Sequence, residues 1–154
     1  MDNNELIEIL YKHKKWLNHE EGGKCANLSN RDLCHSNLND RDLCYSNLYR
    51  ANLSNSDLRY SNLRGAYLDY SNLREADIDY SAWPLWCGSL KAYVDDRIAI
   101  QLLYHTLSVV QHSPYVSNEL KRALLTPGNI DAANRFHRVK ECGKLEVYND
   151  GNTI

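Results

Sequence analysis

The chain has 154 residues, a formal net charge of −2 and 25% charged residues, and this length fits one domain or one compact unit with a small appendage. A net charge this small is not typical of a strongly basic nucleic-acid-binding protein or of a strongly acidic mimic of nucleic acid. The sequence has no apolar run of about 18 residues, opens with no signal peptide, and contains five cysteines without a C-x-x-C pair. We therefore expect a cytoplasmic protein with free thiols that does not bind membranes.

Residues 2–18 are predicted to form a short amphipathic helix. Asp and Asn at its start can cap a helix, and Glu near its N-terminus and Lys near its C-terminus complement the helix dipole. Gly22 and Gly23 end the helical pattern. Because this segment, residues 1–24, directly precedes a repeat, we predict that it caps the open end of the repeat structure. A helix on a membrane surface is the alternative, which the single cluster of lysines and the nearby glutamates disfavour.

From Ala26 to Tyr80 one large aliphatic residue recurs at every fifth position. These positions are Leu28, Leu33, Leu38, Leu43, Leu48, Leu53, Leu58, Leu63, Leu68, Leu73 and Ile78. Asn or Asp precedes each of them, with Tyr67 as the single exception, and Ala, Ser or Arg stands two positions before. The repeating unit is therefore a small residue or Arg, then Asn or Asp, then Leu, then two variable residues.

A period of five residues fits neither a helix nor a flat strand. Five residues of a helix advance about 500°, so successive leucines would spiral around its surface, and in a flat strand an odd step sends alternate leucines to opposite faces. A backbone that turns a corner after each unit lets every leucine point to one axis, with the Asn or Asp outward and the last two residues in the bend. Such internal repetition predicts a solenoid, in which each turn buries its apolar residues against the next.

The units resemble those of the pentapeptide repeat proteins, which wind as a right-handed, four-sided β-helix with four units per coil. By this resemblance, residues 25–82 form a quadrilateral β-helix of nearly three coils. The whole chain is then an all-β solenoid with α caps, in which the N-terminal capping helix precedes the coils, a small helical bundle at 83–143 follows them, and residues 144–154 form a tail. Leucines fill the axis, so function is expected on the outer faces or in the C-terminal part.

One outer face of the predicted column, the third in chain order, carries four acids, one base and two tyrosines that stand one coil apart. Its candidate partner-binding residues are Asp40, Asp57, Arg59, Tyr60, Asp77, Asp79 and Tyr80. Outward tyrosines with interspersed charge favour protein binding, because Tyr brings a large contact area with little rotamer entropy to lose. The alternative is that the tyrosines only shield the coil ladder and stack on each other.

After Ser81 the five-residue rhythm stops at Trp83-Pro84-Leu85-Trp86-Cys87-Gly88, and the proline is predicted to close the coil. Helices are predicted at 95–110, 117–125 and 131–141. The order of repeats, a Trp83–Gly88 connecting segment and a short helical C-terminal part resembles that of phage and bacterial members of the family. Members of the family often pair through their C-terminal ends, so the resemblance implies a homodimer. The residues assigned to this cap and dimer region are Trp83, Trp86, Ile98, Leu102, Leu103, Leu107 and Val110.

The C-terminal part offers few residues for chemistry. Its candidates are His105, His112, His137, Cys87 and Cys142. His105 and His112 would stand about 10.5 Å apart along one helix, too far to share a metal ion. No metalloprotease, nucleophile-elbow or phosphate-loop motif is present. We therefore expect no enzyme, no metal and no cofactor, although a Cys/His pair made by folding stays open.

The leading hypothesis is a non-enzymatic protein-binding protein, an anti-CRISPR-like phage inhibitor of a host nucleic-acid-processing or defence enzyme, that acts through an outer face of the column. By the resemblance, an alternative is a DNA mimic that occupies the DNA site of a type II topoisomerase such as gyrase. The short column and six arginines among the acids disfavour a long mimic. A second alternative is a small-molecule or metal-binding module formed by the C-terminal helices. The expected partner is a protein, and no direct nucleic-acid binding is expected.

Overall fold

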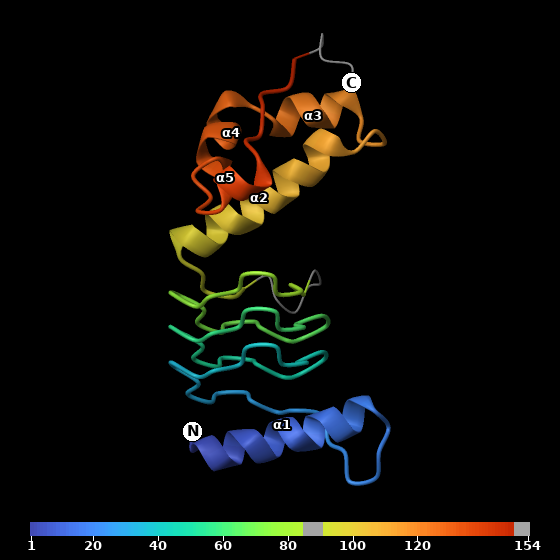
Figure 1. Ribbon diagram of the computed structural model, residues 1–154, viewed down its shortest axis with the longest axis vertical. Helices are drawn as coiled ribbons and strands as arrows, with labels where there is room; N and C mark the ends of the chain where they lie inside the picture. The colour runs from blue at the N-terminus through green and yellow to red at the C-terminus, as the bar shows by residue number, and fades with distance from the viewer. Residues whose placement is uncertain (85–90, 150–154) are drawn as a thin grey trace. The chain divides into compact units, whose positions relative to one another are not determined.

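The computed structural model describes residues 1–84 and 91–149. They divide into two compact units, unit 1 from Met1 to Asp95 and unit 2 from Asp96 onward. Unit 1 contains α1 (Asn3–Leu17) and the coils of the repeat, drawn blue to green in Figure 1. Unit 2 contains α2 (Asp96–His112), α3 (Asn118–Leu124), α4 (Pro127–Ala133) and α5 (Val139–Cys142). None of the helices in the described residues is long and apolar enough to span a membrane.

The repeat winds so that residues 20 positions apart lie side by side. Parallel β-bridges join Asn27 to Asn47 and Asn47 to Tyr67, and the other outer positions of the repeat follow the same spacing. The backbone N–H of Leu28 donates to the Asn47 carbonyl at 2.8 Å, and the Asn47 N–H donates to the Ala26 carbonyl at 2.9 Å. One turn of the winding therefore takes four five-residue units, as the resemblance implied.

Each unit turns a corner by the same local chemistry. The N–H of the residue after the bend donates to the preceding Leu carbonyl, as from Ser36 to Leu33 at 3.0 Å. The second bend residue has a positive φ in every unit from Asn30 to Tyr80. Asn and Gly adopt a positive φ more readily than Tyr does. The Asn or Asp before each Leu also has a role, because its side-chain oxygen accepts the N–H two residues later, as from Arg59 to Asp57 at 3.1 Å.

The interior of the winding holds the aliphatic position of every unit. The leucines are 0–1% exposed and Ile78 is 3% exposed, which confirms that this position points inward. Small residues lie beside them, and among these Ser56 and Ser71 donate their hydroxyls to the carbonyls of Leu53 and Leu68. The function of the coils therefore has to lie on their outer surface.

The winding continues past its predicted end. Ala82 pairs with Asn62, and Tyr93 pairs with Asn72, so a segment after residue 90 adds to the last turn. The sequence predicts a repeat over residues 25–82 that Pro84 closes, so Ala82 pairs inside the predicted repeat, whereas Tyr93 pairs beyond its predicted end. Trp83 is half-buried, and Trp86 and Cys87 lie outside the described residues.

Helix α1 lies against the first units of the repeat. The N-terminal amine donates to the Asp32 carbonyl at 3.1 Å, and Arg31 forms an ion pair with Glu5 of α1 at 2.9 Å. The Ala26 N–H donates to Nδ1 of the buried His13 at 3.1 Å. These contacts fix the helix by its start and by its middle.

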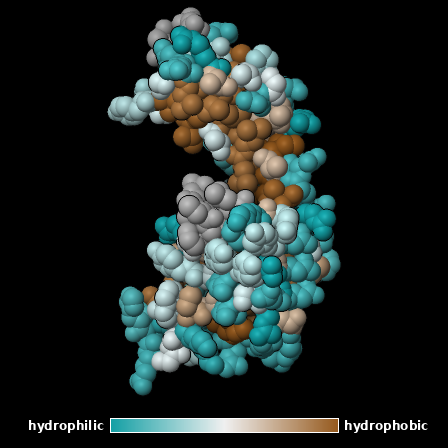
Figure 2. Space-filling view, turned by 180° about the vertical axis from the view of Figure 1, so that it is seen from behind, coloured by the Kyte–Doolittle hydropathy of each residue, from teal (hydrophilic) through white to brown (hydrophobic). Residues whose placement is uncertain are grey.

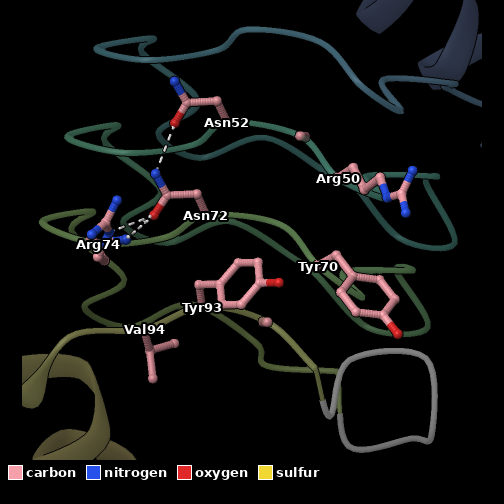
Figure 3. A pocket seen from close by; sticks show the side chains of 9 residues that line it. Arg50, Asn52, Tyr70, Asn72, Arg74, Tyr93 and Val94 are labelled. Carbon is pink, nitrogen blue, oxygen red and sulfur yellow. Dashed lines mark hydrogen bonds between the residues drawn. The ribbon is translucent and has the colours of Figure 1, made fainter.

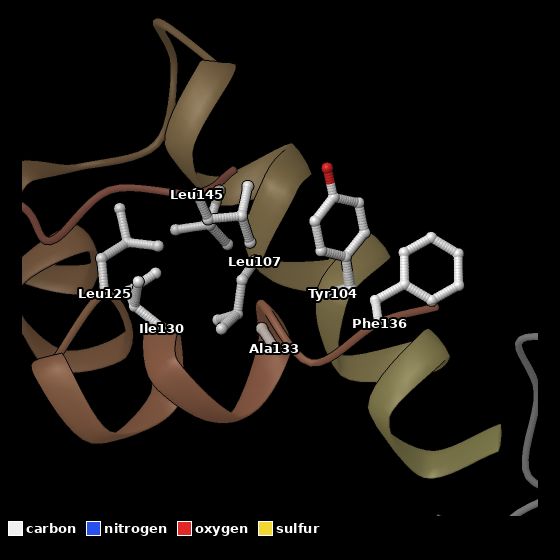
Figure 4. Packing of buried hydrophobic residues seen from close by; sticks show 8 residues of the cluster. Tyr104, Leu107, Leu125, Ile130, Ala133, Phe136 and Leu145 are labelled. Carbon is white, nitrogen blue, oxygen red and sulfur yellow. The ribbon is translucent and has the colours of Figure 1, made fainter. Parts of the chain in front are cut away.

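Unit 2 has its own hydrophobic core, drawn in Figure 4. Its buried residues are Tyr104, Leu107, Val110, Leu125, Ile130, Ala133, Phe136 and Leu145. The predicted helix at 131–141 was wrong, because the chain forms α4 and α5 with a break between them. Pro127 starts α4, since its fixed φ suits the first helical position, and the Thr126 hydroxyl accepts the Asn129 N–H.

The predicted tail is packed over its first residues. Asn134 holds Leu145 by two hydrogen bonds, from the Leu145 N–H at 2.8 Å and to the Leu145 carbonyl at 2.9 Å. The Tyr148 N–H donates to the Leu125 carbonyl at 3.2 Å. Residues 145–148 are therefore part of the fold of unit 2, which the polar composition of this stretch did not predict.

Candidate functional site

The third face brings together most of the residues that the register predicts for it. Parallel bridges join Asn37 to Asp57 and Asp57 to Asp77, so these positions superpose from coil to coil. Arg59 follows Asp57 by two residues in the same unit. The face therefore presents a column of acids with one arginine beside it.

Arg59 connects two of these acids. Its Nε and Nη2 donate to the two carboxylate oxygens of Asp57 at 2.9 and 2.7 Å, and its Nε lies 3.7 Å from Oδ2 of Asp77. The hydrogen bond from the guanidinium lowers the pKa of Asp57 to about 2. Both Arg59 and Asp77 keep more than 40% of their side-chain surface exposed, at 47% and 41%. The arrangement is a charged cluster with fixed geometry, open to a partner.

Tyr60 and Tyr80 stand beside this cluster at the corner of the coil. Their rings are stacked, with centroids 4.8 Å apart and planes at 5°. Each remains largely exposed, Tyr60 at 56% and Tyr80 at 58%. Both residues have a positive φ, which costs a bulky side chain about 1–2 kcal/mol. The two tyrosines therefore stack on each other, as the alternative of a purely structural role predicts. The exposed sides of the two rings are nevertheless accessible to a partner.

Two other candidates differ in exposure. Asp40 is exposed and its N–H donates to the Arg59 carbonyl at 2.9 Å. Asp79 is only 8% exposed, so it offers almost no surface to a partner. The exposed residues of this candidate surface, called the tyrosine–acid face below, are Asp40, Asp57, Arg59, Tyr60, Asp77 and Tyr80.

The residues predicted for dimer contact lie mostly inside the chain. Leu107 and Val110 belong to the core of unit 2, Ile98 is 0% exposed, and Leu102 and Leu103 are half-buried. These side chains therefore offer less surface to a second copy than the exposed apolar side chains of unit 2 do. The apolar side chains that unit 2 does expose come from other positions, Val109 at 67%, Tyr115 at 96% and Leu120 at 46%. Figure 2 shows hydrophobic side chains gathered on unit 2, whereas the visible surface of the coils is mainly hydrophilic.

The histidines of unit 2 make packing or backbone contacts. His105 and His137 lie against the Phe136 ring, with centroids at 5.4 and 4.8 Å. Nδ1 of His112 lies 2.9 Å from the Ser108 carbonyl in the same helix. Within residues 1–84 and 91–149, no three His, Cys, Asp or Glu side chains are grouped so that they could hold a metal ion.

Comparison with protein families identifies the type of repeat. The family model of the pentapeptide repeats matches residues 24–59 and 46–79, with eight copies. A comparison with curated proteins gives no match.

Several solved pentapeptide repeat proteins are similar to the chain. Rfr23 from the cyanobacterium Cyanothece 51142 shares 24% identity over 47% of this chain and 49% of its own, with a TM-score of 0.30. HetL, a protein involved in heterocyst differentiation regulation in Nostoc sp. strain PCC 7120, shares 27% identity over 48% and 35%, with a TM-score of 0.23. QnrB1, a plasmid-mediated fluoroquinolone resistance protein, shares 21% identity over 53% and 43%, with a TM-score of 0.28.

The chain thus spans less than half the length of each of these three proteins. The family assignment follows from the match of the repeat model to residues 24–79 and from the bridges 20 residues apart. Residues 24–79 of the chain are therefore pentapeptide repeats, and they wind as a solenoid of parallel β-bridges with four five-residue units per turn.

Proposed function

We propose that this chain is a non-enzymatic protein that binds a partner protein through the tyrosine–acid face. The observation that carries the proposal is the exposed stack of Tyr60 and Tyr80 beside the cluster of Asp57, Arg59 and Asp77. Stacked rings are already ordered, so they lose little rotamer entropy when a partner covers them. The acids beside them supply directional acceptors for Lys, Arg or backbone N–H groups of the partner.

The charge pattern favours a protein partner over nucleic acid. Carboxylates on this face repel phosphates, and the nearest cation, Arg59, is bonded to Asp57. The same bond also weakens the case for a long DNA mimic, because it neutralises one acid in the column. A partner protein that contacts the fixed Asp57–Arg59–Asp77 cluster directly therefore fits this face better than a DNA-binding protein attracted by a long row of negative charges.

We further propose that the partner is a host nucleic-acid-processing or defence enzyme, which the chain inhibits as phage anti-CRISPR proteins do. This step is supported by the resemblance of the repeats and joint to phage and bacterial pentapeptide repeat proteins. The DNA site of a topoisomerase is the second target class that the family resemblance supplies, and the test below distinguishes it by the identity of the captured enzyme.

The test is capture of the partner from host lysate by the purified protein and by surface variants. Tyr60→Ala with Tyr80→Ala, and charge reversal of Asp57 and Asp77 to Lys, are expected to lose the captured protein while the far-UV circular dichroism stays unchanged. The matched control is Tyr49→Ala with Tyr67→Ala, which removes another stacked pair, with centroids 5.5 Å apart, from a different face. Equal loss with the control, or capture that both variants retain, would move the site away from this face.

We also propose that the chain forms a homodimer through unit 2, with Val109, Tyr115 and Leu120 as contact residues. Their exposure supports this version, as do the hydrophobic side chains that gather on unit 2 in Figure 2, because exposed apolar patches mark interaction surfaces. Sedimentation velocity at high micromolar concentration is expected to give the dimer mass for the wild type and the monomer mass for Leu120→Lys. A wild-type monomer at that concentration contradicts the proposal.

A further inference from the structure

Unit 1 contains a hollow on a different side of the coil from the tyrosine–acid face. Its volume is about 650 Å³, and it lies where the segment after residue 90 joins the last turn (Figure 3). The lining residues are Arg50, Ala51, Asn52, Tyr70, Asn72, Arg74, Ala92, Tyr93 and Val94. We propose that this hollow binds an organic anion that carries a planar ring, with the chemistry of a mononucleotide or an aromatic acid.

The wall of the hollow is held by backbone pairing. The Tyr93 N–H donates to the Ser71 carbonyl at 2.7 Å, and the Leu73 N–H donates to the Tyr93 carbonyl at 2.8 Å. The Tyr70 N–H donates to the Lys91 carbonyl at 3.0 Å. These bonds hold residues 91–93 against residues 70–73, about one turn apart in the winding, so the side chains that these two stretches contribute to the hollow project from a hydrogen-bonded backbone.

Two guanidinium groups face the hollow without a carboxylate partner in the described residues. Nε of Arg74 donates to Oδ1 of Asn72 at 3.1 Å, which orients the rest of the guanidinium. Asn72 is itself fixed, since its amide donates to Asn52 at 3.2 Å, as the dashed lines in Figure 3 show. No Asp or Glu is among the lining residues. Arg74 therefore offers its remaining N–H donors to an anion from outside.

The second guanidinium lies against aromatic rings. Arg50 stands over the rings of Tyr49 and Tyr70 at 5.0 and 5.8 Å from their centroids. Nζ of Lys91 lies 5.4 Å from the centroid of the Tyr70 ring. The acid near them, Asp69, is buried and accepts the Lys91 N–H at 3.2 Å. The positive charge at the mouth of the hollow is thus held by stacking rather than by an exposed carboxylate.

Two tyrosines supply a surface for a planar group. Tyr70 and Tyr93 have centroids 6.5 Å apart and planes at 53°, and they are 37% and 55% exposed. Rings inclined at this angle cannot stack fully on each other, so the more exposed Tyr93 ring, which has no cation over it in the described residues, leaves a face for a ligand ring. Unpaired donors beside open aromatic faces match a ligand with an oxyanion at one end and a ring at the other. A phosphate and a carboxylate share this chemistry, and the experiment separates them.

The test is an NMR titration of the full-length protein with four probes: adenosine 5′-monophosphate, indole-3-acetate, adenosine and inorganic phosphate. We expect the two ring-bearing anions to shift the backbone amides of Tyr70, Arg74 and Tyr93, and to saturate. Adenosine and phosphate, which each lack one half of the recognised pattern, are expected to bind at least about tenfold more weakly. The ring-bearing anion that binds more tightly shows whether the hollow prefers a mononucleotide or an aromatic acid. No saturable shift with either one overturns the proposal.

A matched variant pair tests the role of Arg74. Arg64 repeats its local structure, with Nε donating to Oδ1 of Asn62 at 3.0 Å, but Arg64 does not line the hollow. Arg74→Gln is expected to weaken binding of the better probe by about tenfold or more, whereas Arg64→Gln leaves it unchanged. Tyr93→Ala is expected to weaken the ring-bearing anions and not inorganic phosphate. Equal weakening by both Arg variants would show general attraction of anions and would contradict a specific site.

Discussion

At the scale of single residues, His13 makes the attachment of α1 sensitive to acid. Its ring is 0% exposed, its Nδ1 accepts the Ala26 N–H, and it stacks on Trp16 with centroids 5.7 Å apart. Burial lowers the pKa of His13 below its ordinary value of 6.5, with the Asp42 charge acting in the opposite direction. Protonation would replace the acceptor on Nδ1 by a donor, so the charged ring no longer fits the site.

The unfolded chain therefore binds the proton on His13 more tightly than the folded chain does. The stability that the neutral ring contributes is fully present above pH 6.5 and is lost as the pH falls through the lower, folded-state pKa. Urea unfolding followed by circular dichroism between pH 8 and pH 5 is expected to show this loss. His13→Gln should flatten the pH dependence, whereas His35→Asn, at an exposed corner, should not. A wild-type midpoint that rises with acid would contradict the account.

Gly65 is the second residue whose role can be measured. It is the only glycine among the repeat corners, with a φ of +68°, and a Cβ there would lie 2.5 Å from Cδ1 of Tyr45. Gly65→Ala is expected to destabilise the protein by about 1–3 kcal/mol, from backbone strain and displacement of the ring. Denaturant unfolding of Gly65→Ala, Tyr45→Ala and the double variant separates the two effects. If the double variant loses as much as the sum of the single variants, the ring contact contributes nothing.

At the scale of elements, the inward leucine of each unit defines the coil. Leu53 and Leu58 have no exposed surface, and a carboxylate at either position would be surrounded by other leucines without water or a partner. Leu53→Asp is expected to abolish the cooperative thermal transition of the coils, while Asn55→Asp, at an exposed corner of the same unit, should leave it near wild type. A near-wild-type transition for Leu53→Asp would refute the inward register.

The coil could be predicted from the sequence because its determinant is local and periodic. A five-residue spacing of Leu fixes the register, and the register in turn placed Tyr60 above Tyr80 and Asp57 above Asp77. The role of the Asn or Asp position was missed, although its near invariance among the units was the signal for the hydrogen bond to the N–H two residues later. The added segment around Tyr93 was missed because its pairing uses only backbone atoms.

Outside the repeat, the sequence predicts less because competing signals meet at one residue. A proline such as Pro127 can follow the end of one helix or occupy the first turn of the next, and here it starts α4, which the sequence prediction of a helix at 131–141 did not include. The burial of Asp79 and the hollow near Arg74 were not predictable from the register either. Both depend on how side chains from coils 20 residues apart pack in space, which spacing along the chain does not specify.

At the scale of the whole molecule, the segment around Tyr93, which pairs with the last turn, determines which truncated fragments keep their backbone hydrogen bonds. A fragment that ends at Ser81 lacks Ala82 and Tyr93, whose carbonyls accept the N–H groups of Leu63 and Leu73. It exposes unpaired backbone along the last turn, so we expect aggregates or end-to-end oligomers. A fragment that ends at Asp95 keeps these bonds and should associate less. Size-exclusion chromatography with light scattering makes the comparison, and a monomeric, cooperatively folding 1–81 fragment would contradict the prediction.

The central claim is that the tyrosine–acid face contacts a partner protein, and site-specific photocrosslinking in host cells tests it most directly. A photoreactive phenylalanine analogue replaces Tyr60 in one variant and Tyr11 of α1 in another, because the two tyrosines have similar exposure, at 56% and 62%. We predict one discrete crosslinked protein from position 60 that is absent from position 11 and is lost when Asp57 and Asp77 are reversed to Lys. A crosslink from position 11 alone, or the same products from both positions, would contradict the claim.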